Sequence, residues 1–379
     1  MRASRSSNAE RPRPNGPHFF PFEATSTPLT TAQLLAGANR QLETFASNDP
    51  IDQFTTDRPF SKWLIANKIE SVFGNGIFNE KVRISNDSNY QNFTGDDRVT
   101  YNRRDTVRKA PFQHYEAHDG FTLNETELAN NGIILTDDKN AVMAEAEKIQ
   151  IVNLLTENWS ALRDGFQENW DLEVHMDGST NPKAVPGLDA LVSTTPAVGV
   201  IGGIDAATSP YWRNWADMGI STATAGNLIS HMETLWRKTI TYGKLGAPNA
   251  IFVGSAMYDA IQADALKVMS RQIGIGANST GGITLDPSTK ALAFKGVPVV
   301  WDPSFDALDG QLGPITYPWA KRGYFLNSKA LTLRPVKGRW MVKRTPPRVY
   351  DRYTHYFGQT ADYGLTTKKR NSNAVFSIA

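Results

Sequence analysis

Residues 187–215 read GLDALVSTTPAVGVIGGIDAATSPYWRNW. Three glycines fall within residues 199–203, and three aromatic side chains fall within residues 211–215. A phosphate-binding loop needs fixed glycine spacing and a helix N-terminus directly behind it, because the helix amides bind the anion. GVIGG lacks the G-x-G-x-x-G spacing, and the following IDAATSP indicates a turn. We therefore interpret the glycines as a flexible joint that leads into aromatic packing anchors.

Other motifs that suggest chemistry are weak in the same way. GIGANSTGG (274–282) has no Gly-Lys-Ser/Thr and leads into a strand, whereas a Walker A loop leads into a helix. FVGSA (252–256) partly resembles the nucleophile elbow G-x-S-x-G, but the second glycine is absent, so we expect Ser255 to be a helix N-cap. His114 and His118 lie on an extended segment that offers no third metal ligand. The sequence predicts no catalytic residue, no cofactor site and no metal site.

Composition sets the broad class. The chain has 379 residues, which favours two or three domains. It is 40% hydrophobic and lacks an apolar run of the roughly 18 residues that a membrane span needs, so no membrane partner is expected. It contains no cysteine, which excludes disulfides and thiolate chemistry and fits synthesis in a reducing cytosol.

Charge is distributed unevenly. Residues 321–379 carry 13 Lys and Arg against two acidic residues, whereas residues 1–320 carry 27 basic and 36 acidic side chains. A basic end on an acidic body favours contact with nucleic acid or self-association between oppositely charged faces. A solvated face is the alternative interpretation, and we favour pairing between subunits.

The order of predicted elements is distinctive. Residues 1–60 have the composition of an extended arm, and 78–123 predict two strands around a polar excursion, broken by Pro111 and turned at Asp119-Gly120. Residues 137–173 contain no proline and carry an apolar stripe, which predicts a helix about 55 Å long. A coiled-coil dimer is the alternative for this helix. A mixed α/β region follows, with a helix over 222–242 and a strand over 250–253.

This order resembles the major capsid proteins of tailed bacteriophages, whose shell fold is shared with encapsulins and the herpesvirus capsid floor. The motifs that carry the resemblance are GLDALV (187–192), GVIGGID (199–205), YWRN (211–214), KGVPVVWD (295–302) and GYFLNSKAL (323–331). The resemblance covers essentially the whole chain and implies an α+β fold with an N-arm, an E-loop hairpin, a peripheral domain with a long spine helix, and a mixed α/β axial domain. The implied boundaries are 1–60 for the N-arm, 61–77 for a helical peripheral segment, 78–123 for the E-loop, 124–180 for the peripheral domain with the spine helix, 181–335 for the axial domain and 336–379 for a C-terminal return to the peripheral domain.

The resemblance also implies a function. The expected role is a non-enzymatic capsid protein that forms hexamers and pentamers around double-stranded DNA, made in the bacterial host cytoplasm and located in the virion. The implied partners are further copies of the chain, a portal, a separate scaffolding protein, a decoration protein, and DNA on the inner face. The candidate inter-subunit contacts are Phe19, Phe20, Phe22, Arg103, Arg104, Tyr211, Trp212, Trp215, Arg344 and Arg348. An encapsulin-like compartment and a nucleotide-binding α/β enzyme are the alternatives.

Overall fold

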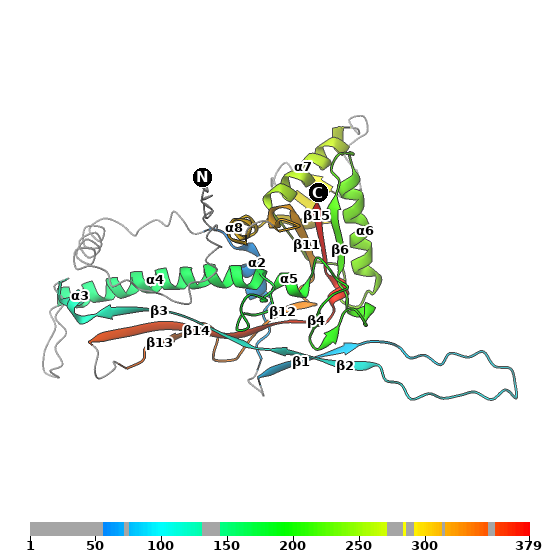
Figure 1. Ribbon diagram of the computed structural model, residues 1–379, viewed down its shortest axis with the longest axis horizontal. Coiled ribbons are helices and arrows are strands. Elements are labelled where there is room, and N and C mark those ends of the chain that lie inside the picture. Colours follow the sequence, from blue (N-terminus) through cyan, green and yellow to red (C-terminus); the bar gives the residue numbers. More distant parts are fainter. Residues whose placement is uncertain are drawn as a thin grey trace, which may run out of the picture.

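A computed structural model describes residues 56–71, 76–130, 145–270, 283–285, 292–312, 315–347 and 353–379. Two larger sheets and one long helix organise these residues (Figure 1). The chain passes from one sheet to the other and back again near its C-terminus. The mixed helix and strand content agrees with the α+β fold class that the sequence predicts.

The larger sheet has seven strands in the order β6-β15-β11-β7-β10-β9-β8. Its strands are β6 (Trp215–Ile220), β7 (Ala250–Val253), β8 (Ile283–Leu285), β9 (Leu292–Phe294), β10 (Val297–Trp301), β11 (Arg322–Leu326) and β15 (Ala374–Ile378). The run AIFV of β7 is buried throughout, as expected for a strand that is covered on both faces. The helices α6 (Asn227–Thr241) and α7 (Ser255–Ser270) pack against this sheet, and Leu228, Met232 and Leu235 of α6 are buried there.

The second sheet is built around β14 (Thr354–Thr367). β3 (Tyr115–Asn124) pairs antiparallel with residues 354–363 of β14 along one edge. β12 (Leu331–Pro335) and β13 (Val342–Arg344) pair with β14 along the other edge. Because β14 is fourteen residues long, it links all the other strands of this sheet.

The long helix α4 (Glu145–His175) runs beside this sheet (Figure 1). Its 31 residues correspond to about 46 Å at 1.5 Å per residue. Leu162, Phe166, Trp170 and Val174 recur every four residues and are buried, so one face of the helix covers the strands. This confirms the helix from Glu145 onward and its apolar stripe over the part whose side chains are described, from Leu154 onward. The predicted start at Asp137 lies outside the described residues.

A single apolar cluster joins the two sheets. It contains Phe166 and Trp170 of α4, Tyr363 of β14, and Phe252 and Tyr324 of the seven-stranded sheet. The end of α4 therefore packs against the same core that supports the larger sheet. The remaining short elements are α2 (Pro59–Ala66), α3 (Glu125–Asn130), α5 (Leu188–Leu191), α8 (Pro303–Leu312) and the 3₁₀ turns Pro210–Trp212, Trp319–Lys321 and Arg370–Ser372.

Three predictions about these elements are wrong. Asp119-Gly120 is not a turn, because Gly120 lies within β3 opposite Gly358 and a Cβ there would be 2.8 Å from the Phe357 carbonyl oxygen. Close approach of two strands, rather than turn geometry, explains this glycine. Ser255 does not cap α7 with its side chain, because its Oγ donates to Asp306 Oδ1 at 2.7 Å.

The third concerns the C-terminus. Residues 336–379 do not return as one unit to the sheet beside α4. β14 lies in that sheet, but β15 pairs with β6 and β11 inside the seven-stranded sheet. Conversely, β12 lies within the range 181–335 that was predicted to be the axial domain, yet it pairs with β14. Strand pairing across distant segments decides these positions, and no local pattern in the sequence encodes it.

Candidate functional site

The most prominent projection is a two-stranded ribbon. β1 (Ile77–Arg83) and β2 (Val107–Gln113) pair antiparallel from Ile77–Gln113 to Arg83–Val107, and residues 84–106 connect them without regular structure. The ribbon extends away from the two sheets (Figure 1). Its strand pairing ends at Gln113, so the projection is shorter than the predicted range 78–123, and Tyr115 already belongs to β3.

The root of the ribbon is the part that the rest of the chain covers. Glu80 of β1 is nearly buried, and its Oε1 accepts hydrogen bonds from Arg334 Nη2 at 2.6 Å and from Thr366 Oγ1 at 3.2 Å. Lys368 Nζ lies 3.9 Å from the other carboxylate oxygen. One acid of the ribbon therefore holds groups from β12, from β14 and from the segment after it, which fixes the ribbon on the second sheet.

A small hairpin supports the other side of the root. β4 (Val200–Ile201) and β5 (Ile204–Asp205) are joined by Gly202 and Gly203, which both have positive φ, as a two-residue type I′ turn requires. A Cβ on Gly202 would lie 3.0 Å from the side chains of Ala110 and Phe112 of β2. The glycines thus form a close-packed turn against the ribbon, and the prediction of a flexible joint is wrong. The helix N-terminus that a phosphate loop needs is missing, because only the short 3₁₀ turn Pro210–Trp212 follows.

The three aromatic anchors have different environments. Trp212 is 1% exposed, and its Nε1 donates to the Ile201 carbonyl at 2.9 Å. It therefore packs inside its own chain, which corrects its place among the inter-subunit candidates. Trp215 and Tyr211 are half-buried, and Trp215 Nε1 donates to the Asn371 carbonyl at 3.0 Å. These two side chains keep surface for a neighbour and remain predictions.

The connecting loop of the ribbon carries exposed apolar side chains. Tyr90, Phe93 and Tyr101 are 84%, 65% and 92% exposed. Arg103 and Arg104 lie in the same loop and are exposed as well. Several large aromatic side chains close together on a projection are unusual for a monomer surface and are typical of a contact surface. Arg103 and Arg104 remain predicted contacts.

The basic C-terminal segment is partly neutralised within the chain. Arg322 Nη1 lies 3.1 Å from Asp189 Oδ1, Arg339 Nη1 lies 2.8 Å from Asp362 Oδ2, and Arg334 binds Glu80. Arg370 is buried and donates to the carbonyls of Leu191 and Trp212, and burial lowers its pKa to about 10. Intrachain pairing was not anticipated from the sequence, because the acidic partners are distant along the chain.

Arg344 is exposed, and its Nε donates to Thr360 Oγ1 at 3.0 Å. It remains a predicted contact. The other candidates, Phe19, Phe20, Phe22 and Arg348, lie outside the described residues.

A buried charged cluster was missed by sequence reasoning. His175 at the end of α4 donates Nδ1–H to the Asp171 carbonyl at 2.6 Å, and its Nε2 lies 3.5 Å from Asp302 Oδ2. Ser61 and Ser304 donate their hydroxyls to the Asp171 carboxylate. The cluster joins α2, α4 and the start of α8. The i, i+4 spacing of Asp171 and His175 was the available signal, but Asp302 is far away in sequence.

Electrostatics favour a charged imidazole in this cluster. Burial opposes the charge on His175, but Asp171 and Asp302 outweigh it and raise the pKa of His175 to about 9. Burial works against the ionised form of Asp302 as well, but the bond to His175 outweighs it and lowers the pKa of that carboxyl. The ligand atoms of the three residues lie within 4.8 Å of one another, close enough to share a cation. Nδ1 donates to a carbonyl, whereas Nε2 faces the Asp302 carboxylate at ion-pair distance without a hydrogen bond, so the arrangement is that of an imidazolium between two acids.

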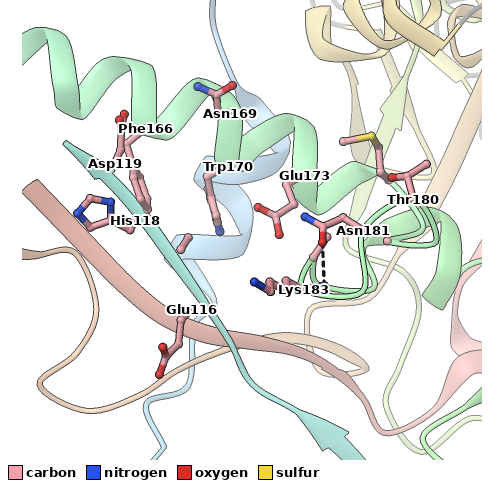
Figure 2. A pocket seen from close by; sticks show the side chains of 14 residues that line it. Glu116, His118, Asp119, Phe166, Asn169, Trp170, Glu173, Thr180, Asn181 and Lys183 are labelled. Atoms are coloured by element: carbon pink, nitrogen blue, oxygen red, sulfur yellow. Dashed lines mark hydrogen bonds between the residues drawn. The ribbon is translucent and has the colours of Figure 1, made fainter. Parts of the chain in front are cut away.

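A cleft of about 530 Å³ lies between α4, β3 and the residues after α4 (Figure 2). Trp170 and Glu173 of α4 point into it, and Lys183 lies across from them (Figure 2). Burial raises the pKa of Glu173, whose Oε1 accepts a hydrogen bond from the Val185 amide at 3.1 Å. Glu116 and His118 reach the cleft from β3. Its lining residues do not combine a nucleophile with a positioned base, so they make no catalytic arrangement.

Comparison with known proteins identifies the fold. No family model matches the sequence, and no curated protein matches it. A chain of the cyanophage A-1(L) capsid asymmetric unit matches with a TM-score of 0.58 at 16% identity, over 87% of this chain and 96% of that chain. The capsid of Myoviridae phage XM1 matches with a TM-score of 0.53 at 10% identity, over 88% of this chain and 96% of that chain. The capsid of the native GTA particle matches with a TM-score of 0.50 at 12% identity, over 88% of this chain and 96% of that chain.

The chain has the tailed-phage capsid fold. This confirms the fold that the order of elements and the motifs in 187–215 implied. Within the described residues, no helix is long and apolar enough to cross a membrane.

Proposed function

We propose that this chain is the major capsid protein of a tailed phage, which assembles into hexamers and pentamers to form an icosahedral shell around double-stranded DNA. The observation that carries the proposal is the likeness of nearly the whole chain to capsid chains, which leaves little of it for another domain. The exposed aromatic loop of the ribbon supports it, because such a surface needs a partner.

The roles of the segments belong to the same proposal. The ribbon acts as the E-loop, with residues 77–113 as its paired strands and connecting loop. α4 acts as the spine helix, and together with the second sheet, built around β14, it forms the peripheral domain. The seven-stranded sheet with α6 and α7 forms the axial domain. The residues before α2 act as the N-arm on a neighbouring copy, whereas Phe60, which was included in the predicted arm, is buried in the core of its own chain. A portal, a separate scaffolding protein, a decoration protein and the packaged DNA are the further partners, in a virion built in the host cytoplasm.

The proposal assigns the chain a structural role and no enzymatic activity. The described clefts lack a catalytic arrangement, and GVIGG forms a hairpin turn against the ribbon. Calorimetry with ATP and with NAD tests the enzyme alternative, and we expect no heat of binding. Saturable binding of either nucleotide would contradict the structural assignment.

Electron microscopy of the purified full-length protein tests the proposal directly. We expect capsomer rings or closed shells, and interfaces above the roughly 1,000 Å² of biological contacts. A protein that stays monomeric across concentration, salt and pH would overturn the assignment. The nucleic acid and protein content of native particles separates a DNA-filled capsid from an encapsulin-like compartment, which would contain a cargo protein and no genome.

A further inference from the structure

A second cleft, of about 920 Å³, lies where the ribbon meets the seven-stranded sheet. Its walls come from the end of β1 and the residues after it, from residues 210–216, from the end of α6 and from residues 368–371. Among the described strands, β6 pairs with β15 alone and is the edge strand on this side of the sheet. The ribbon extends away from the seven-stranded sheet in Figure 1.

All charged side chains that line this cleft are positive. The lining contains no acidic residue, and its five cationic side chains are Arg83, Arg213, Lys244, Lys368 and Lys369. Half-buried Tyr211 and Trp215 and the 58% exposed Tyr242 add aromatic surface. Five like charges around one cleft raise one another's electrostatic energy, and an anionic partner would relieve that repulsion.

Only part of this charge is balanced within the chain. Lys368 lies 3.9 Å from Glu80, whereas Arg213 donates to the carbonyls of Ala206 and Ala207. Lys369 donates to the Tyr242 carbonyl, and burial lowers its pKa.

The remaining two cations, Arg83 and Lys244, are exposed and form no ion pair with any described residue. They come from two different segments that line the cleft, one at the end of β1 and one after α6. Two separate segments of the cleft therefore offer positive charge without an ion pair.

We propose that this basic cleft receives a carboxylate-bearing surface of a second copy of the chain. The inference rests on the proposed function and adds the chemistry of one subunit contact. Residues 1–320 carry 36 acidic against 27 basic side chains, so a neighbouring copy supplies the complementary charge. The cleft and its acidic counterpart are different surfaces of one chain, which is the arrangement of a head-to-tail interface that closes into a ring.

A protein partner fits this place better than a phosphate backbone. The ribbon that forms one wall also carries Tyr90, Phe93 and Tyr101, which are exposed and need an apolar partner. A second copy in the cleft could cover apolar surface and pair with the cations together. Nucleic acid would satisfy the cations but leave the aromatic side chains of the loop in water.

The test is a charge reversal at the two exposed cations, R83E/K244E. K337E reverses one exposed cation outside the cleft and serves as the location control, and R83K/K244R, which keeps both charges, is the control matched in position. Circular dichroism and thermal unfolding establish that each variant folds. Assembly is followed by sedimentation and electron microscopy over a range of protein concentrations. We expect R83E/K244E to need at least about tenfold more protein to assemble, and K337E and R83K/K244R to behave as the unmodified chain.

The outcomes separate this inference from the proposed function. If the unmodified chain never assembles, the proposed function fails. If it assembles and R83E/K244E assembles equally well, only the basic-cleft inference fails. Binding of a labelled 20-base-pair DNA duplex is measured alongside by fluorescence anisotropy. Normal assembly of R83E/K244E with a loss of duplex binding that K337E does not show would reassign the cleft to nucleic acid.

Discussion

Replacing Glu80 by Gln tests whether one buried acid holds the ribbon in place. The Glu80 side chain is 9% exposed and the Arg334 side chain is 16% exposed, so their contact is largely removed from water. Loss of one partner of a buried pair costs about 3–5 kcal/mol, because the other charge remains buried. Gln keeps the shape of the side chain and one acceptor oxygen, and the Arg334 side chain stays partly exposed to water. We therefore expect the substitution to destabilise the attachment of the ribbon by about 2 kcal/mol, less than the full loss of a buried partner.

The effect should be local to the ribbon before it is global. If the ribbon opens as a unit, 2 kcal/mol corresponds to about 30-fold faster amide exchange. Hydrogen exchange of the full-length protein, followed by mass spectrometry, measures this for peptides within 77–113. Peptides from α6 serve as the internal reference, since the buried apolar side chains of this helix belong to a separate cluster.

The matched control is Glu116→Gln. The Glu116 side chain is 66% exposed and lies 3.9 Å from Arg339, so its loss should cost less than about 0.5 kcal/mol. Unchanged exchange of the ribbon in E80Q would refute the argument that Glu80 fixes it. An equal change in E116Q would show that any lost acid loosens the sheet.

Three further predictions concern the core and the hairpin. Because the pKa of His175 is raised, the stabilisation from its charged form is fully present below pH 6.5 and is lost as the pH rises through about 9. Thermal unfolding from pH 6 to 10 should therefore show a falling Tm, and His175→Gln should make this fall smaller. Equal slopes in both proteins would contradict the ion cluster. Gly202→Ala should lower the free energy of unfolding by about 1–2 kcal/mol and also speed amide exchange of β2. At Gly199, φ is +100° and no atom lies within 4 Å of an added Cβ, so Gly199→Ala should destabilise the protein without changing amide exchange of β2. Trp212→Ala should cost about 3–5 kcal/mol in denaturant unfolding, and the same change at Trp301, which is 47% exposed, should cost far less.

Local patterns were sufficient for the regular elements. The apolar residues at Leu162, Phe166 and Trp170 repeat every four positions, and this spacing describes the buried face of α4. The buried run at Ala250–Val253 is a strand, as its composition indicates. Both depend on side-chain periodicity within a short window, which the sequence displays directly.

The candidate surfaces were harder to infer, because their members are far apart along the chain. Glu80 and Arg334 are 254 residues apart, and His175 meets Asp302 across about half that separation in sequence. No local signal distinguishes these acids from solvated ones. The basic C-terminal segment was assigned to subunits or DNA for the same reason, although Arg322, Arg334 and Arg339 pair within the chain.

By itself, the sequence determined the long helix, the buried strand, the polar excursion between two strands, and the order of elements that resembles a capsid protein. The tertiary structure decided that Gly202 and Gly203 form a tight turn against the ribbon and that Trp212 belongs to the core. It also placed β15 inside the seven-stranded sheet. The physical reason is that periodicity and turn chemistry act over a few residues, whereas strand partners and the pairing of buried charges depend on which distant segments meet.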